Sequence, residues 1–145
     1  FQAADGIRDA RSSLVGSEMC IRDRHTTAHR RGLKVWYGDA VREHYEAQLI
    51  RHEGAIALEV GFHAEYPKAE ANVAVLTQLL AAEATWRTAL GDEPVAGAFI
   101  GSDRWRRISE VWAEAPEPDD VDATIEVAAR LADYVLAIEP LRRAG

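Results

Sequence analysis

The segment from Glu43 to Glu65 contains the residues whose types and spacing are best suited to chemistry. Polar residues recur there at alternate positions, and those that share one face of an extended chain are His44, Glu46, Gln48, Glu59 and His63, with Arg42 and Glu65 at the end of that face. Imidazole and carboxylate groups are ordinary ligands of zinc, manganese and iron. A bound ion of this kind can activate water for hydrolysis. The sequence therefore offers a candidate metal site, with His44, His63 and Glu59 as the candidate ligands.

A β-hairpin would bring these residues together. The second half of the segment alternates between polar residues and the apolar series Ile56, Leu58, Val60 and Phe62, which is typical of a half-buried strand. Glu53 and Gly54 form a two-residue turn signal, which predicts that residues 39–50 are the preceding strand and that His44 faces His63. Residues 39–50 also fit a helix capped by Asp39 and ended by Gly54. The turn signal favours the strand.

The polar face of this hairpin is expected to be exposed to solvent, because an antiparallel sheet commonly covers one face and leaves the other in water. The spacing also lacks the H-E-x-x-H pattern of helical zinc sites. The sequence therefore favours a non-catalytic binding or protein-interaction module that acts as a homodimer or with another protein partner. The alternative is a metal-assisted hydrolase that uses the His/Glu face. No cofactor is expected.

Arg104 and Arg106 flank Trp105 and form a second candidate binding segment. Guanidinium groups beside an aromatic ring can bind a phosphate or stack on a base. However, the chain has 17 Lys and Arg against 24 Asp and Glu, a net charge of -7, whereas sequence-independent binding to nucleic acid requires a cationic surface. Nucleic acid is therefore disfavoured as a partner, and pairing of these arginines with the surplus acids is favoured.

Composition also bears on location. No apolar run approaches the roughly 20 residues that a membrane span requires, so no membrane association is expected. The single cysteine, Cys20, leaves no disulfide and no indication of an oxidising compartment. A cytoplasmic protein is therefore expected. Arg and Ala are abundant while Lys occurs only at Lys34 and Lys68, a composition that suggests a bacterial source.

The first residues stand apart from the rest of the chain. The string Ser13–Arg24, which reads Ser-Leu-Val-Gly-Ser-Glu-Met-Cys-Ile-Arg-Asp-Arg, resembles a conceptual translation of a sequencing-library adapter, and the residues before it share the resemblance. Such a segment implies no function and is excluded from fold reasoning. We therefore expect residues 1–24 to be a non-native, disordered segment and residues 25–145 to be a single domain that lacks its native N-terminus.

The remaining patterns predict an α+β fold in which an antiparallel sheet of 3–5 strands is covered on one face by two helices. Residues 25–31 are expected to be a frayed lead-in. The expected elements after them are strands over 33–37, 39–50 and 55–65, one long helix from Pro67 to Gly91, a weak strand or loop over 95–100, a strand over 104–112 and a helix capped by Asp119 or Asp120. This order resembles, in topology, part of the secretion-chaperone-like domains.

Overall fold

The computed structural model describes residues 23–145. The adapter-like segment was expected to be disordered over residues 1–24, and residues 1–22 of it lie outside the described residues. Two residues of that segment belong to the fold. Arg24 begins the first strand, and the backbone carbonyl of Asp23 accepts a hydrogen bond from Gly38 at 2.9 Å. The Asp23 carboxylate also pairs with Arg143 at 2.7 Å.

The described residues form one six-stranded antiparallel sheet and three helices. The elements, in chain order, are β1 (Arg24–His29), β2 (Gly32–Tyr37), β3 (Glu43–His52), β4 (Ala55–Ala64), α3 (Ala69–Leu80), α4 (Glu83–Leu90), β5 (Val95–Phe99), β6 (Ser102–Trp112) and α5 (Val121–Ala144). Neighbouring strands follow the order β1-β2-β3-β4-β6-β5. The α+β class is as predicted, but the prediction of a sheet of 3–5 strands covered by two helices is wrong.

The additional strand is β1, where the sequence predicted a frayed lead-in. It pairs with β2 from Arg24 opposite Tyr37 to His29 opposite Gly32. Every residue of β1 is exposed, so the strand has no buried face and no apolar alternation by which its sequence could be recognised. The backbone pairing with β2, rather than side-chain burial, defines this edge strand.

The hairpin of β3 and β4 has the predicted register, which confirms the strand over the helix for this segment. Tyr45 lies opposite Phe62 and His44 opposite His63. The turn residues Glu53 and Gly54 have φ angles of 51° and 81°. Positive φ at both positions is the geometry of the type I′ turn, whose twist matches that of the strands it joins.

The single long helix predicted between Pro67 and Gly91 is two helices, α3 and α4. The first ends at Leu80, and Ala82 leaves helical geometry with φ -113° and ψ 25°. This break lets the fully buried Trp86 turn back toward α3, where its indole N–H donates to the Leu79 carbonyl at 2.9 Å. The Leu79 carbonyl thus accepts two hydrogen bonds at the end of α3, one from the indole and one from the Ala82 backbone N–H at 3.1 Å.

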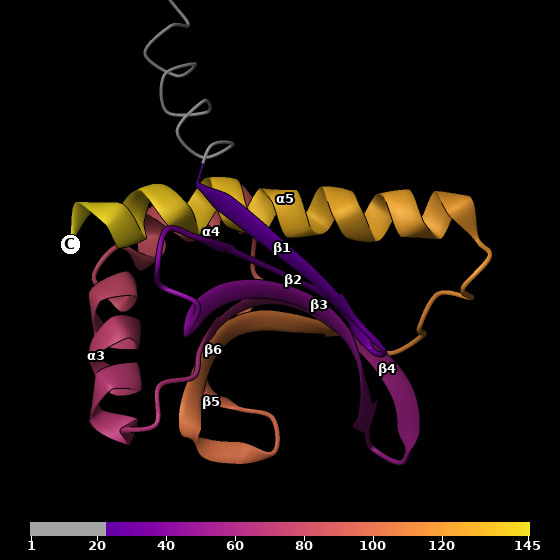
Figure 1. Cartoon of the computed structure of the whole chain (residues 1–145), viewed down its shortest axis with the longest axis horizontal. Coiled ribbons are helices and arrows are strands. Elements are labelled where there is room, and N and C mark those ends of the chain that lie inside the picture. Colours follow the sequence, from indigo (N-terminus) through magenta and orange to yellow (C-terminus); the bar gives the residue numbers. More distant parts are fainter. Residues whose placement is uncertain (1–22) are drawn as a thin grey trace, which may run out of the picture.

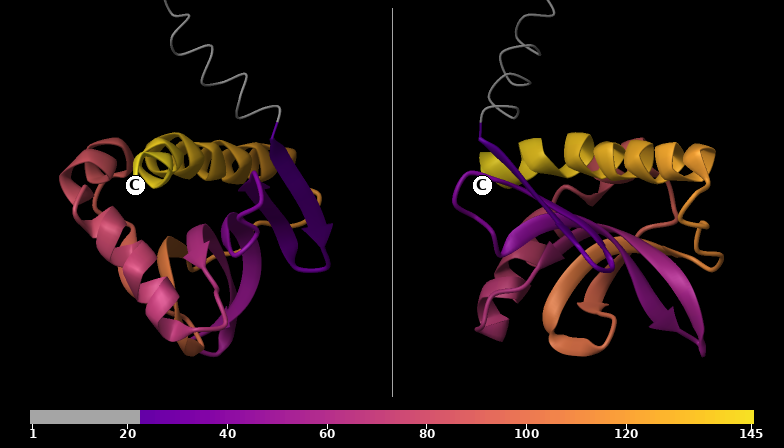
Figure 2. Two further views of the ribbon diagram at one scale, coloured as in Figure 1. Left: turned by 60° about the vertical axis from the view of Figure 1, so that its left-hand side comes forward. Right: turned by 45° about the vertical axis from the view of Figure 1, so that its right-hand side comes forward.

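The helices cover one face of the sheet, and α5 runs along that face from end to end (Figure 1). Side chains of β3, β4 and β6 meet the helices in one core that includes Tyr45, Phe62 and Ile108. Views from two further directions show the sheet bending away from α5 (Figure 2). Among residues 23–145, no helix combines the length and the apolar character needed to span a membrane.

The final helix begins as predicted, since the Asp120 side chain accepts a hydrogen bond from the Ala123 backbone at 3.0 Å. Its apolar side chains are buried only toward its C-terminal end. Leu131 and Ile138 are buried in the core, whereas Val121 and Ile125 are 68% and 61% exposed. The first turns of α5 therefore contribute little to the core.

Candidate metal centre

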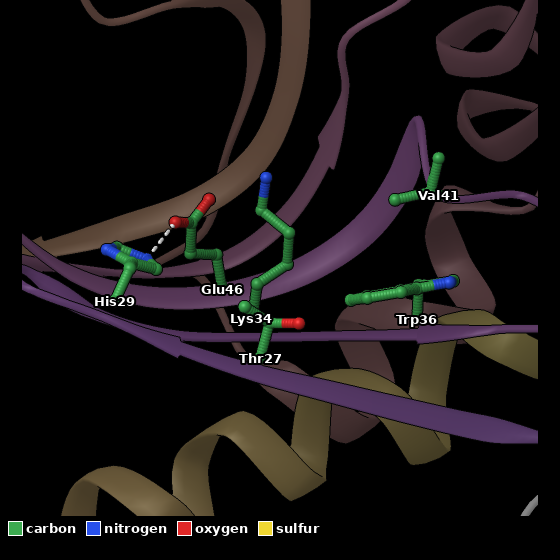
Figure 3. A pocket seen from close by; sticks show the side chains of 6 residues that line it. All are labelled: Thr27, His29, Lys34, Trp36, Val41 and Glu46. Carbon is green, nitrogen blue, oxygen red and sulfur yellow. Dashed lines mark hydrogen bonds and ion pairs between the residues drawn. The ribbon is translucent and has the colours of Figure 1, made fainter.

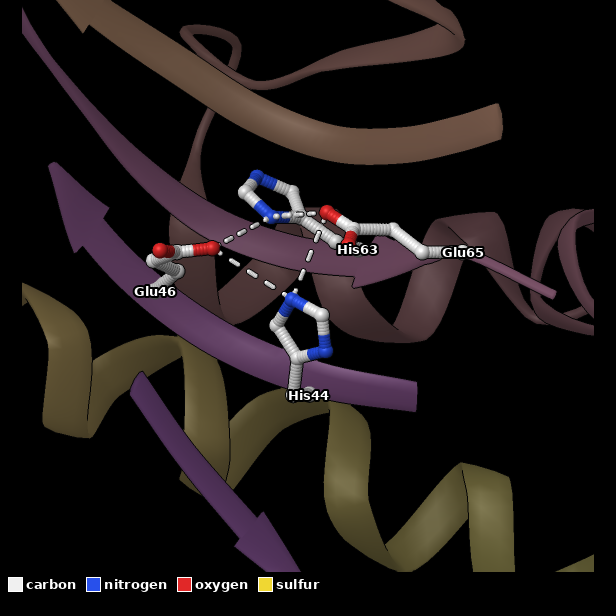
Figure 4. A group of neighbouring side chains, drawn as sticks. All are labelled: His44, Glu46, His63 and Glu65. Carbon is white, nitrogen blue, oxygen red and sulfur yellow. Dashed lines mark ion pairs between the residues drawn. The ribbon is translucent and has the colours of Figure 1, made fainter. Parts of the chain in front are cut away.

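Four side chains converge on the face of the sheet opposite α5. His44 and Glu46 alternate along β3, and His63 and Glu65 occupy the end of β4 and the residue just beyond it. Each strand thus contributes a His-x-Glu pair. We call these four residues the His/Glu cluster; their side chains point toward a common centre (Figure 4).

This face is buried, so the expectation of an exposed polar face is wrong. His44 is 1% exposed and His63 is 0% exposed. Strands β5 and β6 curl beneath the sheet on the side away from α5 (Figure 1), and the Phe99 ring meets the His63 ring edge-on at a centroid distance of 4.7 Å. Alternation in the sequence predicts that one face of the hairpin is apolar and the other polar. It does not predict that the curved sheet, through β5 and β6, covers the polar face.

The ligating atoms of the His/Glu cluster are spaced like the coordination sphere of a metal ion. Oε1 of Glu46 lies 3.4 Å from His44 Nε2 and 3.3 Å from His63 Nδ1. Oε1 of Glu65 lies 3.4 Å and 3.5 Å from the same two nitrogens. All four atoms lie within 4.8 Å of one another. A point equidistant from them is about 2.1–2.4 Å from each, a range that begins at the zinc–nitrogen and zinc–oxygen bond lengths of proteins.

Each histidine is oriented by a hydrogen bond from its other ring nitrogen. Nδ1 of His44 donates to the Val41 carbonyl at 2.9 Å. Nε2 of His63 donates to the Glu59 carboxylate at 2.6 Å, and Gln48 donates to the other oxygen of Glu59 at 3.0 Å. A ligating histidine usually donates its second N–H in this way, which fixes the tautomer and turns the remaining lone pair toward the metal.

The two nitrogens that face the centre have no hydrogen-bond partner among residues 23–145. They are His44 Nε2 and His63 Nδ1, and both are inaccessible to solvent. Buried polar atoms without a partner are rare in folded proteins and call for an explanation such as an ion. In each histidine the other ring nitrogen donates its N–H, to Val41 or to Glu59. The nitrogen without a partner is therefore the one that carries a lone pair and can act as an acceptor.

The cluster attracts positive charge. Burial opposes a charge on His63, yet the carboxylates of Glu59, Glu46 and Glu65 raise its pKa well above the ordinary value. Burial likewise opposes ionisation of Glu65, but its contacts with His44 and His63 lower its pKa to about 2. A proton and a metal ion compete for the same imidazole nitrogens. The negative charge of the carboxylates favours binding of a proton or of a metal ion at these nitrogens.

Gly61 lies opposite Glu46 in the hairpin. A β-carbon at this position would collide with the Ile108 carbonyl oxygen and with Ser109 on the neighbouring strand β6. Glycine therefore allows β4 and β6 to approach closely at the level of the cluster, a role that glycine has wherever backbone meets backbone.

A shallow hollow of about 440 Å³ borders the cluster. Its lining residues come from β1, β2, β3 and the loop before β3, and they are Thr27, His29, Lys34, Trp36, Val41 and Glu46. Glu46 belongs to both sites, because its Oε1 atom faces the cluster and its Oε2 atom accepts a hydrogen bond from His29 at 2.7 Å.

Comparison of the chain with protein-family models, with curated proteins and with solved structures finds no match.

The structure brings together most, but not all, of the residues singled out in the sequence. His44, Glu46 and His63 meet, whereas Glu59 and Gln48 stand behind His63 rather than at the centre. Glu65, which was expected only at the end of the face, takes the place foreseen for Glu59. The sequence reasoning missed Glu65 as a ligand, although the repeated His-x-Glu spacing in the predicted register is a signal by which it can be found.

Arg104 and Arg106 do not join the site. Arg107 lies opposite His63 and shares its face of the sheet. Arg104 and Arg106 are an odd number of residues from Arg107 in β6, so they lie on the face away from the His/Glu cluster. The Arg104 guanidinium donates to the Pro67 carbonyl at 2.6 Å, and that of Arg106 donates to the Asp103 carbonyl at 2.6 Å. These bonds use backbone acceptors rather than the surplus acidic side chains.

Proposed function

We propose that this protein binds one divalent transition-metal ion in the His/Glu cluster. The observation that carries the proposal is the pair of buried imidazole nitrogens without hydrogen-bond partners, His44 Nε2 and His63 Nδ1, which share a centre with two carboxylate oxygens. Their second nitrogens are already bonded to Val41 and Glu59, so the lone pairs that remain are available to a metal.

A network of ion pairs without a metal accounts for the geometry less well. The N···O contacts inside the cluster are 3.3–3.5 Å, longer than the 2.7–2.9 Å of charge-assisted hydrogen bonds. Neither inward-facing nitrogen makes a hydrogen bond. Leaving a buried charge without a hydrogen bond is costly, whereas a bound cation would satisfy both nitrogens and both carboxylates at once.

The ligand set favours zinc, manganese, iron or cobalt over calcium and magnesium. Imidazole suits transition metals, while calcium and magnesium prefer sites made of oxygen ligands alone. Two nitrogen and two oxygen ligands would complete the tetrahedral sphere of structural zinc. An ion that prefers six ligands would keep two positions for water or substrate.

Metal-assisted hydrolysis is the activity that we propose for this centre. The hollow supports it, because Glu46 lines the hollow and also belongs to the cluster. In this reaction water adds to a carbonyl or phosphoryl centre, the bond to the leaving group breaks, and the leaving group takes up a proton from the water. The competing proposal is the non-catalytic interaction module, acting as a homodimer or with a protein partner, in which the ion only stabilises the hairpin.

Elemental analysis tests the metal proposal. Protein stripped with a chelator, incubated with zinc or manganese and passed through a desalting column should retain about one ion per chain. His63→Ala and the milder Glu65→Gln should retain none, while His52→Ala, a change at the far end of β3, should behave as wild type. Retention of metal by both cluster variants with unchanged circular dichroism would overturn the proposal.

Cobalt substitution separates a catalytic centre from a structural one. A closed four-ligand site gives intense visible absorption bands, whereas added water ligands give weak ones. Weak bands that change when a carboxylate competitor is added would support hydrolysis. Intense bands that no added anion alters would favour the structural role.

A further inference from the structure

The hollow next to the His/Glu cluster is a shallow, open feature on the same face of the sheet. Its volume of about 440 Å³ lies in the lower part of the range of ligand pockets, about 300–1,000 Å³. Figure 3 shows His29 and Glu46 toward one end of the hollow, Trp36 and Val41 toward the other, and Lys34 between them. The hollow is therefore bounded by the proposed metal centre and by residues that are not part of it.

Lys34 supplies a positive charge inside the hollow. It lies directly opposite Glu46 on the paired strands, yet the Glu46 carboxylate bonds to His29 instead. Lys34 forms no ion pair with any residue in the described part of the chain, 23–145. Its amine points into the space between Glu46 and Trp36 (Figure 3), where it can meet an anion.

Trp36 and Val41 supply an apolar wall. The Trp36 ring is stacked on the His25 ring, with a centroid distance of 5.3 Å and an interplanar angle of 19°. This stacking holds the indole in place, so the wall is formed before anything binds. A flat apolar group can pack on such a ring.

We propose that the hollow binds a small organic carboxylate with an apolar body. Lys34 would pair with the carboxylate, Trp36 and Val41 would contact the body, and the group to be hydrolysed would face Glu46. A monoanion fits the hollow better than a dianion. Lys34 supplies one positive charge there, and the nearby Glu46 carboxylate would repel additional negative charge. The inference names the substrate class of the metal centre and thus rests on the proposed function.

Calorimetric titration of metal-loaded protein with benzoate tests this assignment. Lys34→Met, which keeps most of the apolar stem and removes the charge, should weaken benzoate binding by about tenfold or more, as expected for loss of a charge-assisted bond. Lys68→Met is the matched control, since Lys34 and Lys68 are the two lysines of the chain, and it should bind benzoate as wild type does. Equal affinities of the two variants would overturn the inference, as would tighter binding of phenyl phosphate than of benzoate.

A second measurement does not depend on the variants folding. In a ¹⁵N spectrum of wild-type protein, benzoate should shift the indole N–H signal of Trp36, and an unmoved signal would overturn the inference. Failures can be told apart, because metal retention without benzoate binding removes the substrate assignment alone. Benzoate binding that depends on Lys34 in a protein that retains no metal would remove the proposed function but leave an anion site.

Discussion

His44 lies directly opposite His63 in the β3–β4 hairpin, with ring centroids 5.4 Å apart and ring planes inclined at 82°. A glutamate follows each histidine two residues later, Glu46 within β3 and Glu65 just beyond the end of β4. Because the strands are antiparallel, the two His-x-Glu pairs are related by an approximate two-fold axis through the histidine pair. One hairpin therefore provides the whole candidate coordination sphere.

Metal binding should raise the stability of the fold, because the four ligands come together only in the folded hairpin. At a free ion concentration one hundred times the dissociation constant, the gain should be about 2.7 kcal/mol. Thermal unfolding with and without zinc measures it, and a chelator should reverse it. The double variant His44→Ala/His63→Ala should show no gain; a gain equal to that of wild type would place the ion elsewhere.

Glu59→Gln should weaken metal binding without abolishing it. The Glu59 carboxylate accepts the N–H of His63 at 2.6 Å, and loss of such a partner typically lowers metal affinity about 10–100-fold. Competition with a chromophoric chelator gives the affinity. Glu53→Gln in the exposed turn is the control. Complete loss of metal in folded Glu59→Gln would instead make Glu59 a ligand.

Gly61→Ala should destabilise the fold by about 1–3 kcal/mol, the usual cost of forcing extra volume into a packed site. The added methyl group would collide with the Ile108 carbonyl and Ser109. Gly97→Ala, where a β-carbon meets nothing within 4 Å, provides the comparison and should be close to neutral. Urea unfolding distinguishes the two, and equal stabilities would show that β4 and β6 can separate freely.

Glu139→Gln should cost about 3 kcal/mol, because it breaks a buried ionic network. The Glu139 carboxylate accepts hydrogen bonds from Tyr45 at 2.8 Å and from Arg142 at 2.7 Å, and so fastens the end of α5 to β3. Glu126→Gln on the exposed side of the same helix should have little effect. Denaturant unfolding gives both values; similar small losses would mean that packing alone holds α5.

Glu110 should make the fold sensitive to acid. Burial opposes its ionisation, but hydrogen bonds from Arg130, Trp112 and Tyr134 hold its pKa below the ordinary value of 4.5. The unfolded chain therefore takes up the proton first, and the stabilisation, complete above about pH 5, is lost as pH falls through the folded pKa.

The Glu110→Gln variant tests whether the stabilisation by Glu110 is lost as pH falls. Its stability deficit relative to wild type should be largest near pH 7 and should shrink as pH falls toward 3. Unfolding in urea across that range measures the deficit, with Glu117→Gln in the exposed linker as the control. A deficit that stays constant with pH would show that the carboxylate charge is not what stabilises the contact.

The sequence predicted the central hairpin well because its cues are local. The alternation of Leu58, Val60 and Phe62, together with a Glu-Gly turn, determines both the register and the faces. The pairing of His44 with His63 follows from the same cues. Features that depend on distant parts of the chain were missed. Burial of the polar face depends on β5, which carries Phe99 onto His63.

The helical region shows the same limit. The apolar spacing between Pro67 and Gly91 continues through the break at Ala82, because Trp86 fits the periodic pattern of either one helix or two. At the break, the Trp86 indole donates a hydrogen bond to the Leu79 carbonyl, a side-chain contact that periodicity does not report. Strand β1 was missed because all its side chains are exposed and only its backbone pairs.

Anomalous diffraction from crystals grown with zinc or manganese would locate the ion itself. We expect one strong peak within about 2.1–2.4 Å of His44 Nε2, Glu46 Oε1, His63 Nδ1 and Glu65 Oε1. No peak among these four atoms, with the two imidazoles hydrogen-bonded to the carboxylates instead, would contradict it.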